Sequence, residues 1–267
     1  MSVDSKRSTP PEAEPLGIVE KIRNAFNDFV HEVVEVVKED GRNILCLDPL
    51  PKSFDYSYSL LSYFWTVIFM TSRTIGAKFG KVGIVKAFLG ILGDPGLFLL
   101  TYVLLPVYAI LLHRKTPQAH MSTAERRLCI MGFALFLGAA TEFFWSSYVQ
   151  PTKAPSYYLP LVVGLSIQIA GPLMQGNRVG FIAATVGIAS CVSLFIAKTV
   201  RILDLTYILC TIISASLSIV NLQLLIADKS KTEHEMTSGH LRTLLLSTYI
   251  HMVTTVLFAS KPTFENK

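Results

Sequence analysis

The stretch VGFIAATVGIASCVSLFIAKTVRILDLTYILCTIISASLSIVNLQLLI, residues 179–226, decides what kind of fold this chain adopts. Its first part, residues 179–197, contains no charged side chain, and its second part, residues 203–226, contains only Asp204. A helix needs about 20 mainly apolar residues to cross the roughly 30 Å hydrocarbon core of a bilayer. Both parts have about that length, so the stretch predicts two consecutive membrane-spanning helices.

Apolar runs of similar length recur along most of the chain. Seven spans are expected, at about residues 58–77, 96–113, 128–149, 158–175, 179–197, 203–226 and 242–259. Only Gly176, Asn177 and Arg178 separate the fourth span from the fifth, so a tight hairpin is expected there, because irregular backbone exposed to lipid is not tolerated. Residues 78–94 are interpreted as either a loop or an interfacial helix. The predicted fold class is an all-α membrane protein of about seven transmembrane helices.

Composition agrees with a membrane protein. The 267 residues are 51% hydrophobic and 16% charged, with a mean hydropathy of +0.47, whereas soluble domains carry roughly 25% charged residues. The net charge of +5 is uneven, since residues 1–57 hold 7 Lys/Arg against 11 Asp/Glu and the remainder holds 17 against 8. The basic residues gather in short clusters between the apolar runs, which is typical of membrane loops and not of a nucleic-acid groove. The expected surroundings are a lipid bilayer, and no nucleic-acid partner is expected.

The N-terminal segment differs from the rest. Residues 1–15 are polar and Pro-rich and are expected to be a disordered tail without the apolar region of a signal peptide. Residues 16–39 predict an amphipathic helix too charged to span a bilayer. Its apolar face is formed by Ile18, Ile22, Phe26, Phe29 and Val33, with Val30 and Val37. This face packs on its own protein, lies at a membrane surface, or docks a partner subunit. Residues 40–57 are expected to be a linker, 58–260 the transmembrane domain and 261–267 a tail.

The loop charges predict the orientation in the membrane. Lys and Arg number eight in the loops on one side, Arg178 among them, and seven on the other, Arg73 among them. The basic residues of the N-terminal segment tip this balance toward a cytosolic N-terminus. Without a cleavable signal, an internal span must direct insertion. This pattern fits a multispanning protein of the endoplasmic reticulum.

Few polar side chains fall inside the expected spans, and each is costly there. Glu142 either snorkels or pairs with a loop arginine, or it lines a polar cavity. His251 is either a neutral histidine bonded across helices or part of a proton or ion relay. Asn221 and Gln223 are amides suited to hydrogen bonds between helices. The small residues Gly76 and Gly80 permit close helix approach.

The sequence predicts no enzyme. We find no Gly-rich phosphate loop, no Gly-x-Ser-x-Gly and no paired aspartates within the spans. His31-Glu32 lacks the second histidine of a zinc-protease helix. His113, His120, His234 and His240 are interpreted as loop residues without ligands at metal-binding spacing. No catalytic residue, cofactor or metal site is therefore expected.

From the third span onward the sequence resembles the Bax inhibitor (transmembrane BAX inhibitor motif) family. Residues 124–128 leading into 132–138 and Thr141-Glu142-Phe143 resemble its basic loop entering a Gly-rich third helix. Residues 218–226, SIVNLQLLI, resemble the sixth-helix motif Phe-Asp-Thr-Gln-Leu-Ile, and residues 244–247, LLLS, stand at the place of Leu-Phe-Leu-Asp. The likeness covers about residues 120–260.

The resemblance implies six helices around a central last helix. It also implies a calcium leak from the endoplasmic reticulum, gated by two aspartates, and protection against cell death. Asn221 and Ser247 stand where the family has those aspartates, and neither can supply the anionic oxygens that a divalent cation requires. We therefore expect a scaffold or accessory subunit of a larger membrane complex, with lipid handling at a contact site as one version. The alternative is a calcium or ion leak channel with altered pH gating that modulates cell death.

Overall fold

The computed structural model describes residues 18–52, 54–109, 121–148, 158–174, 176–227 and 233–259. Every regular element in these ranges is a helix, so the predicted all-α class is confirmed for them. The chain separates into two units, residues 1–45 and residues 46–267. We describe each unit by itself.

The first unit contains one long helix, α1 (Ile18–Leu45). Its described polar side chains are exposed at helical spacing: Glu20, Arg23, Asn24, Asn27, Asp28, His31, Glu35, Lys38, Glu39 and Arg42. The side chains of the predicted apolar face lie outside the described set. The helix runs six residues beyond the expected end at residue 39. The prediction of a linker over 40–57 was therefore partly wrong, since only residues 46–55 connect α1 to the next helix.

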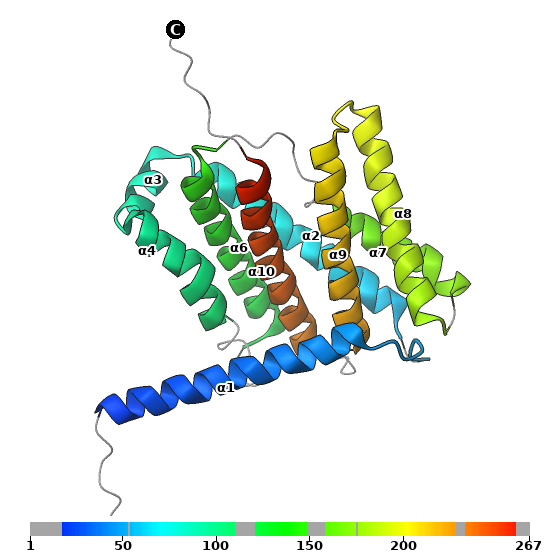
Figure 1. The fold of residues 1–267 in the computed structure, drawn as a ribbon, viewed down its shortest axis with the longest axis horizontal. Coiled ribbons are helices and arrows are strands. Elements are labelled where there is room, and N and C mark those ends of the chain that lie inside the picture. Colours follow the sequence, from blue (N-terminus) through cyan, green and yellow to red (C-terminus); the bar gives the residue numbers. More distant parts are fainter. Residues whose placement is uncertain are drawn as a thin grey trace, which may run out of the picture. The chain divides into compact units, whose positions relative to one another are not determined.

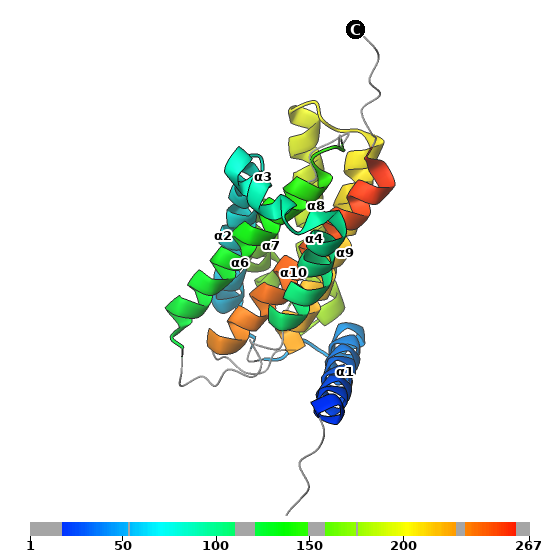
Figure 2. The ribbon, with the colours of Figure 1, turned by 90° about the vertical axis from the view of Figure 1, so that its left-hand side faces the viewer.

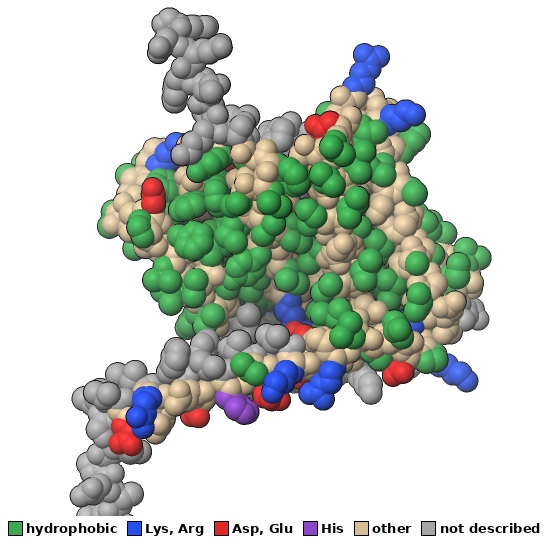
Figure 3. Space-filling model, in the orientation of Figure 1, with side chains coloured by type: hydrophobic (Ala, Val, Ile, Leu, Met, Phe, Trp, Pro, Cys, Tyr) green, Lys and Arg blue, Asp and Glu red, His purple; other side chains and the backbone are tan. Residues whose placement is uncertain are grey.

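Within the described residues of the second unit, four helices are long and apolar enough to cross a membrane. They are α6 (Thr123–Trp145), α8 (Arg178–Thr199), α9 (Leu205–Ala227) and the part Gly239–Phe258 of α10 (Glu233–Phe258). The pair Gly83–Gly90 and Gly93–Ala109, bent by 87°, makes a fifth if it counts as one broken span. Large apolar side chains cover the visible face of this unit (Figure 3), and Ile84, Phe195 and Val256 are 83%, 71% and 65% exposed. The chain is a multispanning helical membrane protein.

The sequence predicts about seven spans, whereas four to five helices of the described structure meet the length and hydropathy that a span requires. The helices α2 (Tyr56–Phe79) and α7 (Leu159–Leu173), at two of the expected spans, do not meet these requirements. The helix α2 covers the expected first span, but it carries Arg73, Lys78 and several hydroxyls that lower its hydropathy. The helix α7 has 15 residues, which gives it a length of about 22 Å at 1.5 Å per residue. That is shorter than a hydrocarbon core of roughly 30 Å.

Residues 78–94, expected to be a loop or an interfacial helix, form two short helices. These are α3 (Gly83–Gly90) and α4 (Gly93–Leu99), and α4 continues through the π-helix η1 (Leu100–Leu104). Gly93 has φ +64°, a conformation that glycine adopts without steric cost. This residue allows the sharp bend between α3 and α4.

The closest helix pair in the second unit is α2 with α6 (Figures 1 and 2). A methyl group on Gly76 would overlap the backbone of Leu135, and one on Gly138 would overlap the carbonyl oxygen of Arg73. The spacing of Gly76 and Gly80 therefore does allow close approach. The two helices that these glycines bring together, α2 and α6, belong to the same chain.

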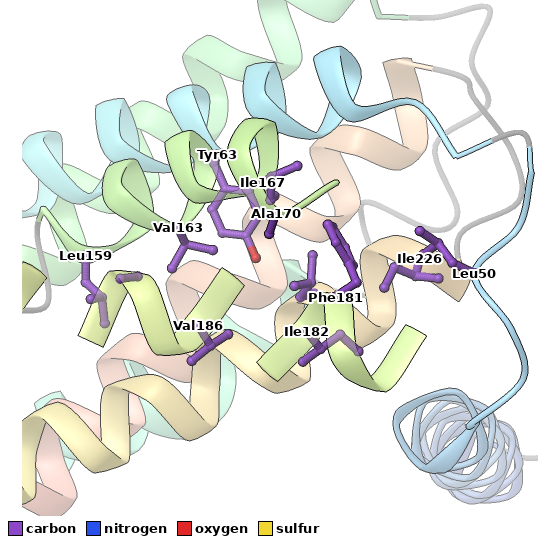
Figure 4. Close-up of a cluster of buried hydrophobic side chains, with 12 residues drawn as sticks. Leu50, Tyr63, Leu159, Val163, Ile167, Ala170, Phe181, Ile182, Val186 and Ile226 are labelled. Carbon is purple, nitrogen blue, oxygen red and sulfur yellow. The ribbon is translucent and has the colours of Figure 1, made fainter. Parts of the chain in front are cut away.

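The remaining helices complete the bundle. The helix α10 packs against α2, α6 and α9, while α7 packs against α2 and α8. The expected hairpin between α7 and α8 is present, with Gly176 at φ +79° and Asn177 capping α8. One cluster of buried hydrophobic side chains in the second unit surrounds Val163, Ile167 and Phe181 (Figure 4).

Candidate functional site: a polar cavity between α2, α9 and α10

Two adjoining cavities of about 40 Å³ each lie between α2, α9 and α10. The His240 cavity is lined by Ser62, Tyr63, Thr66, Asn221, Leu224, Leu225, Gly239, His240, Arg242 and Thr243. The His251 cavity is lined by Tyr63, Met70, Leu159, Pro160, Cys210, Ser214, Leu217, Ser218, Asn221, Thr243, Ser247, Ile250, His251 and Thr254. Tyr63, Asn221 and Thr243 line both. Each cavity exceeds the roughly 10–15 Å³ that one water molecule requires.

Hydroxyl side chains dominate the polar lining because serine and threonine are tolerated inside apolar helices. These hydroxyls donate to backbone carbonyls one turn earlier, as Thr66 does to Ser62 at 3.0 Å and Ser218 does to Ser214 at 2.9 Å. This local bonding lets the hydroxyls face the cavity with their protons already engaged.

Asn221 is oriented by a neighbour on α10. The Thr243 hydroxyl lies 3.1 Å from the Asn221 Oδ1 and 2.9 Å from the Gly239 carbonyl oxygen, and these two acceptors share its single proton. The NH2 group of Asn221 is a donor that remains for the cavity.

Tyr63 brings a buried hydroxyl to both linings. It is 6% exposed, and its hydroxyl has no hydrogen-bond partner in the part of the chain described. Figure 4 shows its ring among Val163, Ile167 and Ala170. An unsatisfied buried donor costs about 1–3 kcal/mol. We therefore expect an acceptor inside the cavity to bind this hydroxyl.

Ser247 lines the His251 cavity and also contacts the guanidinium of Arg73. Its hydroxyl donates to the Leu244 carbonyl at 2.8 Å, and its oxygen lies 3.4 Å from the Arg73 Nη1. Met70, one turn before Arg73 on α2, lines the same cavity. Within the described ranges, no carboxylate lies within 4 Å of the Arg73 guanidinium.

The fixed charges around the two cavities have one sign. Neither lining contains a carboxylate, whereas Arg242 lines the His240 cavity and Arg73 adjoins the His251 cavity through Ser247. Calcium prefers six to eight oxygen ligands, usually including carboxylates. The described residues also contain no group of three or more His, Cys, Asp or Glu side chains able to hold a metal ion. The site suits water or an anion better than a divalent cation.

Three of the five residues singled out from the sequence meet in one place. Asn221, Ser247 and His251 all line the His251 cavity. Gln223 lies elsewhere, 5% exposed, and its Oε1 accepts from the Arg178 Nε at 2.7 Å. It is an interhelical hydrogen-bonding residue, as one interpretation proposed.

Glu142 forms an ion pair, but its partner is a lysine and not the expected loop arginine. Its carboxylate lies 3.1 Å from the Lys81 Nζ, and the two side chains are 29% and 66% exposed. Lys81 comes from the turn after α2, so this is a pairing with a basic residue beside the bundle. Glu142 does not line either cavity.

Several residues of the site were misplaced by the sequence interpretation. Arg73 and Arg178 were counted as loop charges, but Arg73 lies within α2 and Arg178 is 5% exposed at the start of α8. His240 was expected in a loop, but it is 2% exposed on α10, with its Nε2 2.8 Å from the Ser62 carbonyl oxygen. The position of Arg73 in the sequence could have indicated its place in a helix, because it lies inside the run expected to span the membrane. Nothing in the sequence distinguishes Tyr63 from other apolar aromatics.

Comparison with known proteins adds no assignment: no protein-family model, curated protein or solved structure matches this chain.

Proposed function

We propose that this chain is a divergent, Bax-inhibitor-like multispanning protein of the endoplasmic reticulum membrane, with about seven spans and a cytosolic N-terminus. It acts as a scaffold or accessory subunit of a larger membrane complex, with lipid handling at a contact site as one version of that role. Two features support the resemblance. Asn221 and Ser247, at the places of the family's aspartates, line one cavity, and α10 packs against α2, α6 and α9.

The observation that carries the scaffold role is the lining without carboxylates. Where the resemblance implies two carboxylates, the cavity presents an amide and a hydroxyl, and Arg73 adjoins the hydroxyl at 3.4 Å. A fixed positive charge at this place repels calcium and no anionic oxygen offsets it. The bundle is retained while the groups that a calcium path requires are replaced.

The helix α1 supports a partner. Its exposed polar side chains occupy one face of 28 residues, and the sequence places Ile18, Ile22, Phe26, Phe29 and Val33 on the other. An apolar stripe of this length is stable in water only when something covers it. We propose that a partner subunit covers this stripe.

A second candidate function is an ion leak with altered gating. The two cavities share three lining residues, which favours a continuous polar path along α9 and α10. In this role the chain affects calcium homeostasis and cell death, as the resemblance implies.

Calcium flux distinguishes the two functions. In liposomes loaded with a calcium dye, the native chain is expected to give no flux. The pair Asn221→Asp and Ser247→Asp restores two carboxylates to the His251 cavity and is expected to produce flux. Glu142→Gln is the control, because Glu142 pairs with Lys81 outside the lining. Calcium release by the native chain would instead establish the leak.

Partner capture tests the accessory role. The full-length chain, purified in mild detergent and analysed by mass spectrometry, is expected to carry a second polypeptide in fixed stoichiometry. Phe26→Ser with Phe29→Ser is expected to lose it, because these changes remove apolar area from the stripe. Asn24→Ser with Asn27→Ser, at exposed positions of the same helix, should keep it. A chain that always runs alone, or a partner unaffected by the phenylalanine changes, would refute the assignment.

A further inference from the structure

We infer that the His251 cavity, at the end where Ser247 lies next to Arg73, binds a small inorganic anion such as chloride. The first step is charge. Arg73 is a part-buried residue of α2, with a hydroxyl oxygen 3.4 Å away and, in the described part of the chain, no carboxylate within 4 Å. A buried cation is costly unless an anion or several strong acceptors compensate it.

The second step is the balance of donors and acceptors. The Ser247 and Ser218 hydroxyls give their protons to carbonyl oxygens within their own helices. The Tyr63 hydroxyl and the Asn221 NH2 are donors that remain for the cavity, and the Arg73 N–H groups adjoin it at Ser247. These donors and the positive charge beside them are complementary to an anion, while the serine oxygens of the lining keep lone pairs that accept.

The third step is size. A cavity of about 40 Å³ exceeds the roughly 10–15 Å³ that one water molecule requires, so it has room for a monatomic anion. Water alone would accept a proton from Tyr63 but would leave the charge of Arg73 uncompensated.

This site does not depend on the scaffold role. Partner capture and calcium flux report on α1 and on introduced carboxylates, so either experiment can fail while anion binding stands.

The test uses the purified full-length chain in detergent, with chloride replacing gluconate at constant ionic strength. The midpoint of thermal unfolding is expected to rise with chloride and to saturate, because a ligand that binds only the folded state stabilises it by mass action. The chloride NMR line is expected to broaden on addition of protein. Arg201→Gln, which removes an arginine from an exposed turn, is the control and should keep both responses.

Ser247→Asp is the decisive variant. It places a tethered carboxylate beside Arg73, so the chain in gluconate is expected to become as stable as the native chain in chloride. The chloride dependence and the line broadening should disappear. Arg73→Gln should also abolish both, and Ser247→Asp keeps the test valid if Arg73→Gln does not fold. A native chain without saturable chloride dependence, or a dependence that survives in Ser247→Asp, would show that the cavity holds only water.

Discussion

Gly138→Ala is expected to lower the free energy of unfolding by about 3 kcal/mol, the upper end of the usual cost of overpacking. A methyl group at this position would overlap the carbonyl oxygen of Arg73 and approach the amide of Ala77 at 2.9 Å. Both obstacles are backbone atoms of α2, so no side-chain rotation relieves the overlap. The helices α2 and α6 would have to separate along the closest contact of the bundle. Unfolding in mixed micelles with increasing denaturing detergent, followed by circular dichroism, measures the effect.

Gly132→Ala is the matched control on the same helix. No atom lies within 4 Å of the added methyl group, and alanine is favoured over glycine in a helix interior by about 1 kcal/mol. Stability is expected to stay constant or to rise. Equal losses in both variants would mean that helix packing at Gly138 is not the cause.

Gln223→Leu is expected to cost about 1.5–3 kcal/mol, the range for a hydrogen bond to a charged group. The Arg178 guanidinium donates to the Gln223 side chain at 2.7 Å between α8 and α9, and both residues are 5% exposed. The substitution removes this acceptor while the charge stays buried. The same micelle titration measures the loss.

The amide of Gln168 provides the comparison for this bond. Its Nε2 donates to the Tyr56 carbonyl at 2.9 Å, but this exposed bond joins two uncharged groups. Gln168→Leu is expected to cost no more than about 0.5–1 kcal/mol. Arg178→Met combined with Gln223→Leu should recover much of the stability, because an apolar pair can replace a buried polar one at little net cost. A double variant as unstable as the sum of the singles would contradict this explanation.

Much of the helical architecture followed from local pattern. The apolar runs at 179–197 and 203–226 became α8 and α9, and the helical spacing of Ile18, Ile22 and Phe26 became α1. Hydropathy could not reveal that α7 has 15 residues or that α3 and α4 meet at a bend of 87°. These depend on neighbouring helices and on single backbone angles.

The site followed only in part. Asn221, Ser247 and His251 stand out because polar groups are costly among apolar neighbours, and they share one cavity. Arg73 and Arg178 looked like loop charges, because basic residues near the ends of apolar runs usually lie at the membrane surface. A partner on another helix keeps each inside the bundle: Ser247 for Arg73 and Gln223 for Arg178.

The sequence by itself determined that this chain is helical, that several of its helices cross a membrane, and that its embedded polar groups are few. Those properties depend on transfer free energies, which accumulate residue by residue along a segment. Only the tertiary structure decided which polar groups face one another, that Glu142 pairs with Lys81 outside the cavity, and that a positive charge adjoins Ser247. The physical reason is that a hydrogen bond or ion pair depends on distances of a few ångströms between helices, and hydropathy along one helix carries no information about the face of another.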